Sequence, residues 1–285
     1  MSSEDDVDGR AGYAPFDLFP YNPSVAPAYA FVGLFGAAAI LHVAFMIPYR
    51  SVFPLPMAIG CGMEAAGYYF RFRSHDNVRQ TLPFVIQNLL VLAAPPLLAA
   101  SIYMSPRRVA RALGAEKLAF AAGWTSKLFV IVDVACLATQ VAGSIMSGSE
   151  EADEAKRGQT TITVGLVLQI VAFGLFIVYV AAFQVRMRSG SAFSPLGSGL
   201  KWERVVYGLY VVSALFISRN ATRLVEYGRG HDGEMLSNEV WLYVLDATVM
   251  FVIAVILLAL HPGRLRMKLR RLPKTEPLED QIPLS

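Results

Sequence analysis

Long apolar runs dominate this chain, and short polar segments separate them. We count seven runs, at residues 24–47, 55–70, 81–104, 124–146, 160–183, 205–224 and 240–260. A helix rises about 1.5 Å per residue, so a run near 20 residues is long enough to cross the ~30 Å hydrocarbon layer. Backbone polar groups cannot stay unpaired in lipid, so such runs form helices. The pattern therefore predicts an all-α, polytopic membrane protein with seven transmembrane helices.

The composition agrees with this pattern. Of the 285 residues, 55% are hydrophobic and only 16% are charged, and the mean hydropathy is +0.46. These values exclude an ordinary soluble domain. The formal net charge of +3 says little about partners. Cys61 and Cys136 both fall inside apolar runs, and their spacing is neither that of a disulfide framework nor that of a metal site.

Basic residues indicate the orientation, because cytoplasmic loops carry an excess of Lys and Arg. The connections after the first, third, fifth and seventh runs hold roughly twice as many Lys and Arg residues as the amino-terminal segment and the connections after the other runs. We therefore expect the amino terminus outside and the carboxyl terminus in the cytoplasm. We expect a disordered, acidic extracellular segment at residues 1–23, the seven-helix membrane domain at residues 24–262, and a basic cytoplasmic tail at residues 263–285. The acidic stretch 147–158 predicts a mobile outer loop.

Polar and charged residues interrupt the apolar runs, mostly in the half of each run that we place toward the outside. Such residues are rare in membrane spans and usually face the protein interior or a wet cavity. On a helix, the spacing of Arg219, Arg223 and Glu226 puts all three on one face. The candidate substrate-binding residues are Glu64, Tyr68, Arg71, Gln87, Asp133, Gln140, Gln169, Arg219, Arg223, Glu226, Tyr243 and Asp246.

The charges in this set nearly balance, since three arginines accompany four carboxylates. A lone charge at the centre of a membrane helix costs about 2.5–3.5 kcal/mol on insertion scales, so these groups should pair or face water. We expect a polar cavity that opens toward the outer leaflet, with its floor near Glu64 and Asp133. The alternative is a buried ion-pair network that only fixes helix packing. His42 is isolated, and we interpret it as a hydrogen-bonded core histidine.

Eight sequence motifs occur in order along the chain. They are YNPS (21–24), MEAAGYYFR (63–71), QNLLVLAAPPLLAASIYM (87–104), KLFVIVDVACLATQVAG (127–143), GLVLQIVAFGLF (165–176), SRNATRLVEYGRG (218–230), NEVWLYVLDATVM (238–250) and HPG (261–263). Together they resemble the fungal RTA-like proteins, also called the lipid-translocating exporter family. The resemblance implies a seven-helix membrane protein linked to sphingoid-base export, to resistance against amphiphilic toxins and, in one branch, to porphyrin movement. It does not assign roles to individual polar residues.

Two classes of function fit these observations. The first is a membrane lipid transporter that moves or exports amphiphiles such as sphingoid long-chain bases or phospholipids. In it, a carboxylate such as Glu64, Glu226 or Asp246 could hold an amine, or Arg219 and Arg223 could hold a phosphate. The second is a seven-helix lipid sensor that regulates a membrane stress response, with the cytoplasmic surface as its output.

Other classes find less support. The chain has no P-loop, so we expect no direct use of ATP. Its four histidines are scattered, which disfavours an intramembrane metal hydrolase. We therefore expect no enzymatic activity, no cofactor and no metal, and membrane lipids rather than nucleic acid as partners. The resemblance to the RTA-like proteins implies the plasma membrane as the location, with vacuolar or other endomembranes as the alternative. The sequence leaves open the lipid, the direction, the energy source and the oligomeric state.

Overall fold

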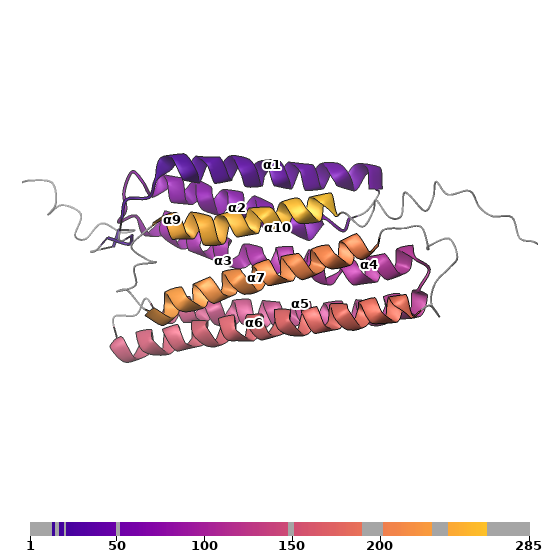
Figure 1. Cartoon of the computed structure of the whole chain (residues 1–285). Helices are drawn as coiled ribbons and strands as arrows, with labels where there is room; N and C mark the ends of the chain where they lie inside the picture. Colours follow the sequence, from indigo (N-terminus) through magenta and orange to yellow (C-terminus); the bar gives the residue numbers. More distant parts are fainter. Residues whose placement is uncertain are drawn as a thin grey trace, which may run out of the picture.

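A computed structural model describes residues 13–14, 17–19, 21–49, 52–147, 151–189, 202–229 and 239–260, which form a bundle of helices (Figure 1). A short helix, α4 (Ser105–Ala112), accompanies the seven long ones. The described residues contain no β-sheet, only an isolated bridge between Tyr13 and Gln80. This confirms the all-α prediction. The long helices are α1 (Val25–Tyr49), α2 (Leu55–Arg73), α3 (Thr81–Tyr103), α5 (Glu116–Ser147), α6 (Ala152–Arg188), α7 (Glu203–Arg229) and a composite helix made of α9 (Glu239–Leu242), a π-helical turn (Tyr243–Ala247) and α10 (Thr248–Ala259).

Consecutive long helices run in opposite directions through the bundle (Figure 1). The last residues of α2, α5 and α7 therefore lie at the same end as the first residues of α1, α3, α6 and α9. We call this end of the bundle the α9 end, and the opposite end the α4 end. The α9 end is the end that the basic-residue count places outside the cell.

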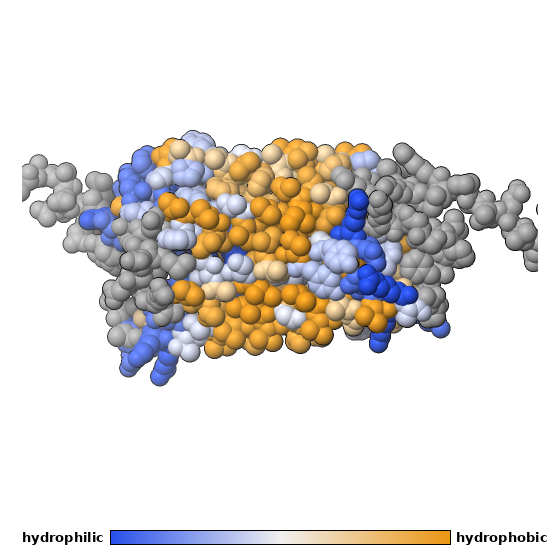
Figure 2. Space-filling view, viewed as in Figure 1, coloured by the Kyte–Doolittle hydropathy of each residue, from blue (hydrophilic) through white to orange (hydrophobic). Residues whose placement is uncertain are grey.

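The outer surface of the bundle is apolar around its middle. Figure 2 shows a belt of hydrophobic residues across the bundle, with hydrophilic residues toward both ends. Large side chains such as Ile40, Ile131 and Val178 are 65–70% exposed. Exposed apolar surface of this extent suits contact with lipid rather than water. Six helices are long and apolar enough to cross a membrane: α1, α3 with α4, α5, α6, α7 and the composite helix.

Helix α2 is not among these six. It has 19 residues and carries Glu64, Arg71 and Arg73, which lower its hydropathy. Its other feature is close packing, because α2 lies against both α1 and α3. A Cβ atom on Gly60 would come within 3.2 Å of the Ala94 carbonyl oxygen, so glycine lets α2 approach the α3 backbone. The seventh transmembrane span therefore stays a prediction.

The bundle consists of two groups of three helices. Helix α2 packs between α1 and α3, helix α6 packs between α5 and α7, and a contact between α3 and α5 joins the two groups. The composite helix lies between α1 and α7 and touches members of both groups (Figure 1). This position lets its side chains reach α2 on one side and α7 on the other.

Helix α6 begins earlier than the sequence predicts. The acidic stretch 147–158 is expected as a mobile loop, but α6 starts at Ala152 within it. Asp153 and Glu154 lie in the first turn, where negative charge interacts favourably with the positive end of the helix dipole. The loop prediction is therefore wrong for residues 152–158. Helix α5 likewise begins at Glu116, eight residues before the predicted run.

Part of the amino-terminal segment packs on the connection between α2 and α3. The Ala14 amide donates to the Arg79 carbonyl at 2.9 Å, and the Leu18 amide donates to the Val78 carbonyl at 3.2 Å. We call the described residues between 13 and 24 the amino-terminal strap. Most of the predicted disordered segment 1–23, and the whole predicted tail 263–285, lie outside the described residues.

Candidate functional site

One group of charged side chains lies between α7 and the π-helical turn. Arg219 Nε lies 2.5 Å from Asp246 Oδ1, and Arg223 Nη2 donates to Asp246 Oδ2 at 2.6 Å. Arg223 Nη1 also donates to Glu226 Oε2 at 3.2 Å. The side chains of Arg219 and Asp246 are only 4% and 6% exposed, so this ion pair is buried. We call Arg219, Arg223, Glu226 and Asp246 the arginine network.

Two local features build the arginine network. On α7, Arg219, Arg223 and Glu226 share one face because they are spaced by four and three residues. Opposite them, residues 243–247 form a π-helical turn that carries both Tyr243 and Asp246. The Thr248 hydroxyl donates to the Tyr243 carbonyl, five residues back, at 2.8 Å. Single π-helical turns inside α-helices occur frequently at functional sites.

Glu64 lies beside the network without joining it. Its side chain is 1% exposed, and neither carboxyl oxygen has a hydrogen-bond partner in the described part of the chain. Electrostatic interactions link Glu64 to Asp246, Arg219 and Arg223. One helical turn later, the buried Tyr68 hydroxyl also has no partner among the described residues. Buried polar groups usually have partners, so this face of α2 calls for an explanation.

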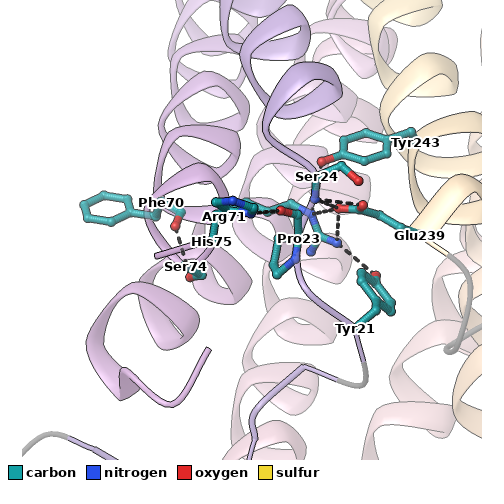
Figure 3. Close-up of polar contacts among 9 residues, drawn as sticks. All are labelled: Tyr21, Pro23, Ser24, Phe70, Arg71, Ser74, His75, Glu239 and Tyr243. Atoms are coloured by element: carbon teal, nitrogen blue, oxygen red, sulfur yellow. Dashed lines mark hydrogen bonds and ion pairs between the residues drawn. The ribbon is translucent and has the colours of Figure 1, made fainter. Parts of the chain in front are cut away.

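Arg71 lies at the centre of a second polar group at the α9 end (Figure 3). Its Nη2 donates to Glu239 Oε1 at 2.8 Å and to the Tyr21 hydroxyl at 2.9 Å, and its Nε donates to the Tyr243 hydroxyl at 3.2 Å. The rings of Phe19, Tyr21 and Tyr243 lie 5.5–5.6 Å from the guanidinium carbon, within range of cation–π attraction. We call this group the Arg71 cluster.

The Arg71 cluster includes residues that the sequence analysis missed. Glu239 accepts hydrogen bonds from the Ser24 amide at 2.9 and 3.1 Å, so it joins the start of α1 to α2 and α9 (Figure 3). His75 Nδ1 donates to the Pro23 carbonyl at 2.7 Å and holds the strap on α2. A signal for Glu239 exists, because it precedes Tyr243 and Asp246 by four and seven residues, the spacing of one helix face.

The remaining candidates lie between α3, α5 and α6. The Tyr103 hydroxyl donates to Asp133 Oδ2 at 2.9 Å, and Gln140 Nε2 donates to Gln169 Oε1 at 2.9 Å. Gln87 on α3 is buried, and its Oε1 has no partner in the described ranges. None of these hydrogen bonds reaches the arginine network.

The structure thus divides the twelve candidates into groups. Glu64 and Tyr68 accompany the arginine network, and Tyr243 belongs with Arg71. Asp133 accepts its hydrogen bond from Tyr103 on α3, and the described contacts do not join it to Glu64. The predicted cavity floor shared by Glu64 and Asp133 is therefore not seen among the described contacts. The expectation that opposite charges pair in the interior is confirmed by Asp246. The role of the twelve residues in substrate binding stays a prediction.

A cavity of about 460 Å³ lies at the α9 end. None of the twelve candidates lines it, although Phe19 and Tyr21 also contact Arg71. Among the described residues, no group of three or more His, Cys, Asp or Glu side chains is placed to hold a metal ion. The lining residues of the cavity are Asp17, Phe19, Tyr21, Asn22, His75, Asp76, Asn77, Val78 and Arg79.

His42 behaves as the sequence predicts. It is 2% exposed, and its Nε2 lies 3.2 Å from the Ala254 carbonyl oxygen. The contact joins α1 to α10 toward the α4 end of the bundle. The interpretation of His42 as a hydrogen-bonded core residue is confirmed.

Comparison with known proteins identifies the family. Residues 57–268 match the family described as RTA1 like protein, a range that covers most of the chain and all twelve candidates. The chain belongs to the RTA1-like family. This confirms the resemblance seen in the sequence motifs. Together with the six helices that are long and apolar enough to cross a membrane, membership of this family indicates an integral membrane protein.

Three relatives show the range of names in the RTA1-like family. Protein RTA1 of Saccharomyces cerevisiae is 31% identical over 273 residues, which cover 87% of this chain and 85% of the relative. Protoporphyrin uptake protein 1 of the same species is 35% identical over 203 residues, 70% of this chain and 66% of the relative. The sphingoid long-chain base transporter RSB1 of the same species is 22% identical over 264 residues, which cover 81% of this chain and 69% of the relative. No solved structure matches this chain.

Proposed function

We propose that this RTA1-like protein moves amphiphilic lipids across the membrane, with its interior charged groups at the α9 end as the site for the polar head. One observation carries the proposal. The ion pair of Arg219 with Asp246 is buried inside a bundle whose outer surface is apolar, and so is Glu64, whose carboxyl oxygens have no hydrogen-bond partner among the described residues. Ionisable residues in such places mark substrate or ion pathways in many membrane proteins. The names of two relatives, a sphingoid long-chain base transporter and a protoporphyrin uptake protein, agree with this class of cargo.

The proposal includes seven spans, with α2 as the seventh and the amino terminus outside. Helix α2 lies between α1 and α3 and has 19 residues, enough for about 28 Å at the usual rise. Its polar residues Glu64, Tyr68 and Arg71 are buried. The low hydropathy of α2 therefore reflects an inward polar face and is compatible with a place among spanning helices.

The proposed route keeps the lipid tail in the bilayer while the head enters the bundle. Helix α7 is the least apolar of the six membrane-crossing helices. Figure 2 shows paler, less hydrophobic residues crossing the apolar belt. A head group that passes beside α7 would reach Arg219, Arg223 and Asp246 without leaving contact with protein. The proposed reaction is movement only, with no catalytic step and no cofactor, and we place it at the plasma membrane.

Reconstitution into lipid vesicles tests the proposal. Purified protein is inserted into vesicles that contain a fluorescent sphingoid base or a fluorescent phospholipid, and a quencher added outside reports the fraction that changes leaflet. We expect the protein to speed exchange of at least one probe over protein-free vesicles and over vesicles with heat-denatured protein. Exchange at the protein-free rate for both probes would contradict the proposal.

A lipid sensor is the second candidate, and the position of the composite helix favours it. This helix is ion-paired to α2 through Glu239 and to α7 through Asp246. A ligand that displaces either pair would shift the helix and transmit binding to the α4 end. Binding of a probe by purified protein without faster exchange in vesicles would support the sensor over the transporter.

A further inference from the structure

The charges beside α7 leave one carboxyl group over. In the arginine network, the two guanidiniums of Arg219 and Arg223 are matched by the carboxylates of Asp246 and Glu226. Glu64 adds a third carboxyl group, which is 1% exposed and is bonded to no guanidinium among the described residues. An ionised Glu64 would leave one uncompensated negative charge in the apolar interior, which is strongly unfavourable. A bound proton or another single positive charge would remove that imbalance.

The groups that face Glu64 supply no such charge. Helix α7 contributes Arg219 and Arg223, and the π-helical turn contributes Asp246, all three already paired. Helix α2 itself contributes the buried Cys61 and the hydroxyl of Tyr68, which is also electrostatically linked to Arg71.

The other neighbours of this face are uncharged or engaged elsewhere. From α1, the rings of Phe31 and Phe35 pack on Tyr68 at 5.5 and 5.9 Å. On α3, the backbone carbonyl of Gln87 lies 3.6 Å from where a Cβ atom on Gly67 would be, and the Gln87 side chain is neutral. Tyr243 of the π-helical turn stacks on Phe31 and accepts from Arg71. Within the described residues, no neighbouring cation is therefore left over to neutralise Glu64.

We infer that Glu64 is a proton-exchange site: it holds a proton in the resting bundle and releases it when the ammonium group of an amphiphile takes its place. The inference rests on the proposed transport function, whose polar-head site it makes specific. One O–H bond of the carboxyl group breaks, the proton goes to solvent, and one ammonium group pairs with the carboxylate, so the charge of the interior is the same before and after. The Tyr68 hydroxyl, one turn away and without a hydrogen-bond partner in the described ranges, is placed to accept from the same ammonium group.

The same exchange would couple transport to a proton. The interior carries one balancing positive charge at Glu64, which is either a proton or an ammonium group. Binding of one therefore requires release of the other, and the two bind in alternation. A neutral amphiphile offers no positive charge and leaves the proton in place. The site therefore selects primary amines over alcohols of the same chain length.

Infrared difference spectroscopy and proton counting on the purified full chain test the inference. A long-chain primary amine is added in detergent, and the alcohol of equal chain length serves as the neutral probe. We expect the amine to remove the carbonyl band of a protonated carboxyl group and to release about one proton per protein into weak buffer. The variant Glu64→Gln should lose both signals. The variant Glu203→Gln, which alters an exposed carboxyl group at the α4 end and outside the proposed site, should keep both.

The outcomes separate the inference from the proposed function. If the amine binds and the carbonyl band stays, the inference is overturned, even if vesicles show lipid exchange. The same holds if Glu64→Gln loses the band as the wild-type protein does. Proton release that depends on Glu64, in a protein that exchanges no lipid in vesicles, supports the site and overturns transport instead. If Glu64→Gln does not fold, Glu64→Asp replaces it, and a proton release unchanged in pH dependence overturns the inference.

Discussion

Asp246 holds the two arginines of α7, since each of its carboxylate oxygens lies against a different guanidinium at 2.5 and 2.6 Å. Glu226 has a smaller part, because among the described residues its ion pair is with Arg223, at 3.2 Å, and its side chain is 23% exposed. Removing one partner of a buried ion pair leaves the other charge uncompensated, which costs more than the pair itself contributes. The two carboxylates should therefore differ sharply in their effect on folding.

We predict that Asp246→Asn lowers the free energy of unfolding by about 3–5 kcal/mol, because it strands two guanidiniums. Glu226→Gln should lower it by about 1 kcal/mol or less, as for partly exposed pairs. Thermal unfolding of both variants in the same detergent measures the difference. Equal effects of the two substitutions would mean that Asp246 is not the centre of the network.

The ion pair between Arg71 and Glu239 should also couple strongly. Its side chains are 3% and 11% exposed. We predict a coupling free energy of about 1 to 3 kcal/mol in a double-mutant cycle of Arg71→Ala and Glu239→Ala. The exposed pair of Arg188 and Glu203, 53% and 45% exposed, serves as the matched control and should give about 0–1 kcal/mol. Equal coupling in the two cycles would contradict the burial argument.

At the scale of elements, the composite helix ties the two groups of three helices together at the α9 end. Glu239 pairs with α2, and Asp246 pairs with α7. Between them, the π-helical turn puts Tyr243 against Arg71. One helix thus carries ion pairs to both groups of helices. Toward the α4 end, the polar contact that the described residues show between this helix and α1 is the bond of His42 to the Ala254 carbonyl.

Close approach of α5 and α6 gives a second prediction at this scale. A Cβ atom on Gly158 would lie 2.5 Å from the Ser147 amide nitrogen and 2.6 Å from the Gly143 carbonyl oxygen, both backbone atoms. Gly158→Ala should therefore destabilise the protein by about 1–3 kcal/mol through overpacking. Gly174→Ala, on the same helix with nothing within 4 Å, should be neutral or slightly stabilising. Thermal unfolding of both variants provides the comparison, and a neutral Gly158→Ala would contradict the packing.

Local patterns predicted the helices and the shared face of Arg219, Arg223 and Glu226, because a span of ten residues contains that information. They did not predict the partner of Arg71, since Glu239 lies 168 residues away in the chain. The helical start of α6 was missed because an acidic stretch has low hydropathy and was interpreted as a loop. The helix dipole, however, favours acidic residues in a first turn. Glu64 was a candidate because it is a charged residue inside an apolar run, on the same helix face as Tyr68 and Arg71. Only the three-dimensional packing reveals that its carboxyl oxygens have no hydrogen-bond partner among the described residues.

At the scale of the whole molecule, the account requires the α9 end to face outward. The native cysteines Cys61 and Cys136 are buried, so a single added cysteine reports its own side of the membrane. We predict that a membrane-impermeant maleimide labels Asp153→Cys in intact cells and labels Lys117→Cys only after permeabilisation. Both positions are exposed, at opposite ends of the bundle. The reverse labelling pattern would invert the proposed orientation.

The central claim is that the buried carboxyl group of Glu64, which has no hydrogen-bond partner in the part of the chain that the structure describes, serves the movement of a polar head and does not serve packing. The most direct measurement is the rate at which purified wild-type protein and Glu64→Gln move a fluorescent sphingoid base across vesicle membranes, with the unfolding temperature of each. We predict an unchanged or higher Tm, since no bond is lost, and a rate lower by about tenfold or more, as for loss of a charged hydrogen bond. A wild-type rate in Glu64→Gln, or a rate that falls only together with Tm, would contradict the claim.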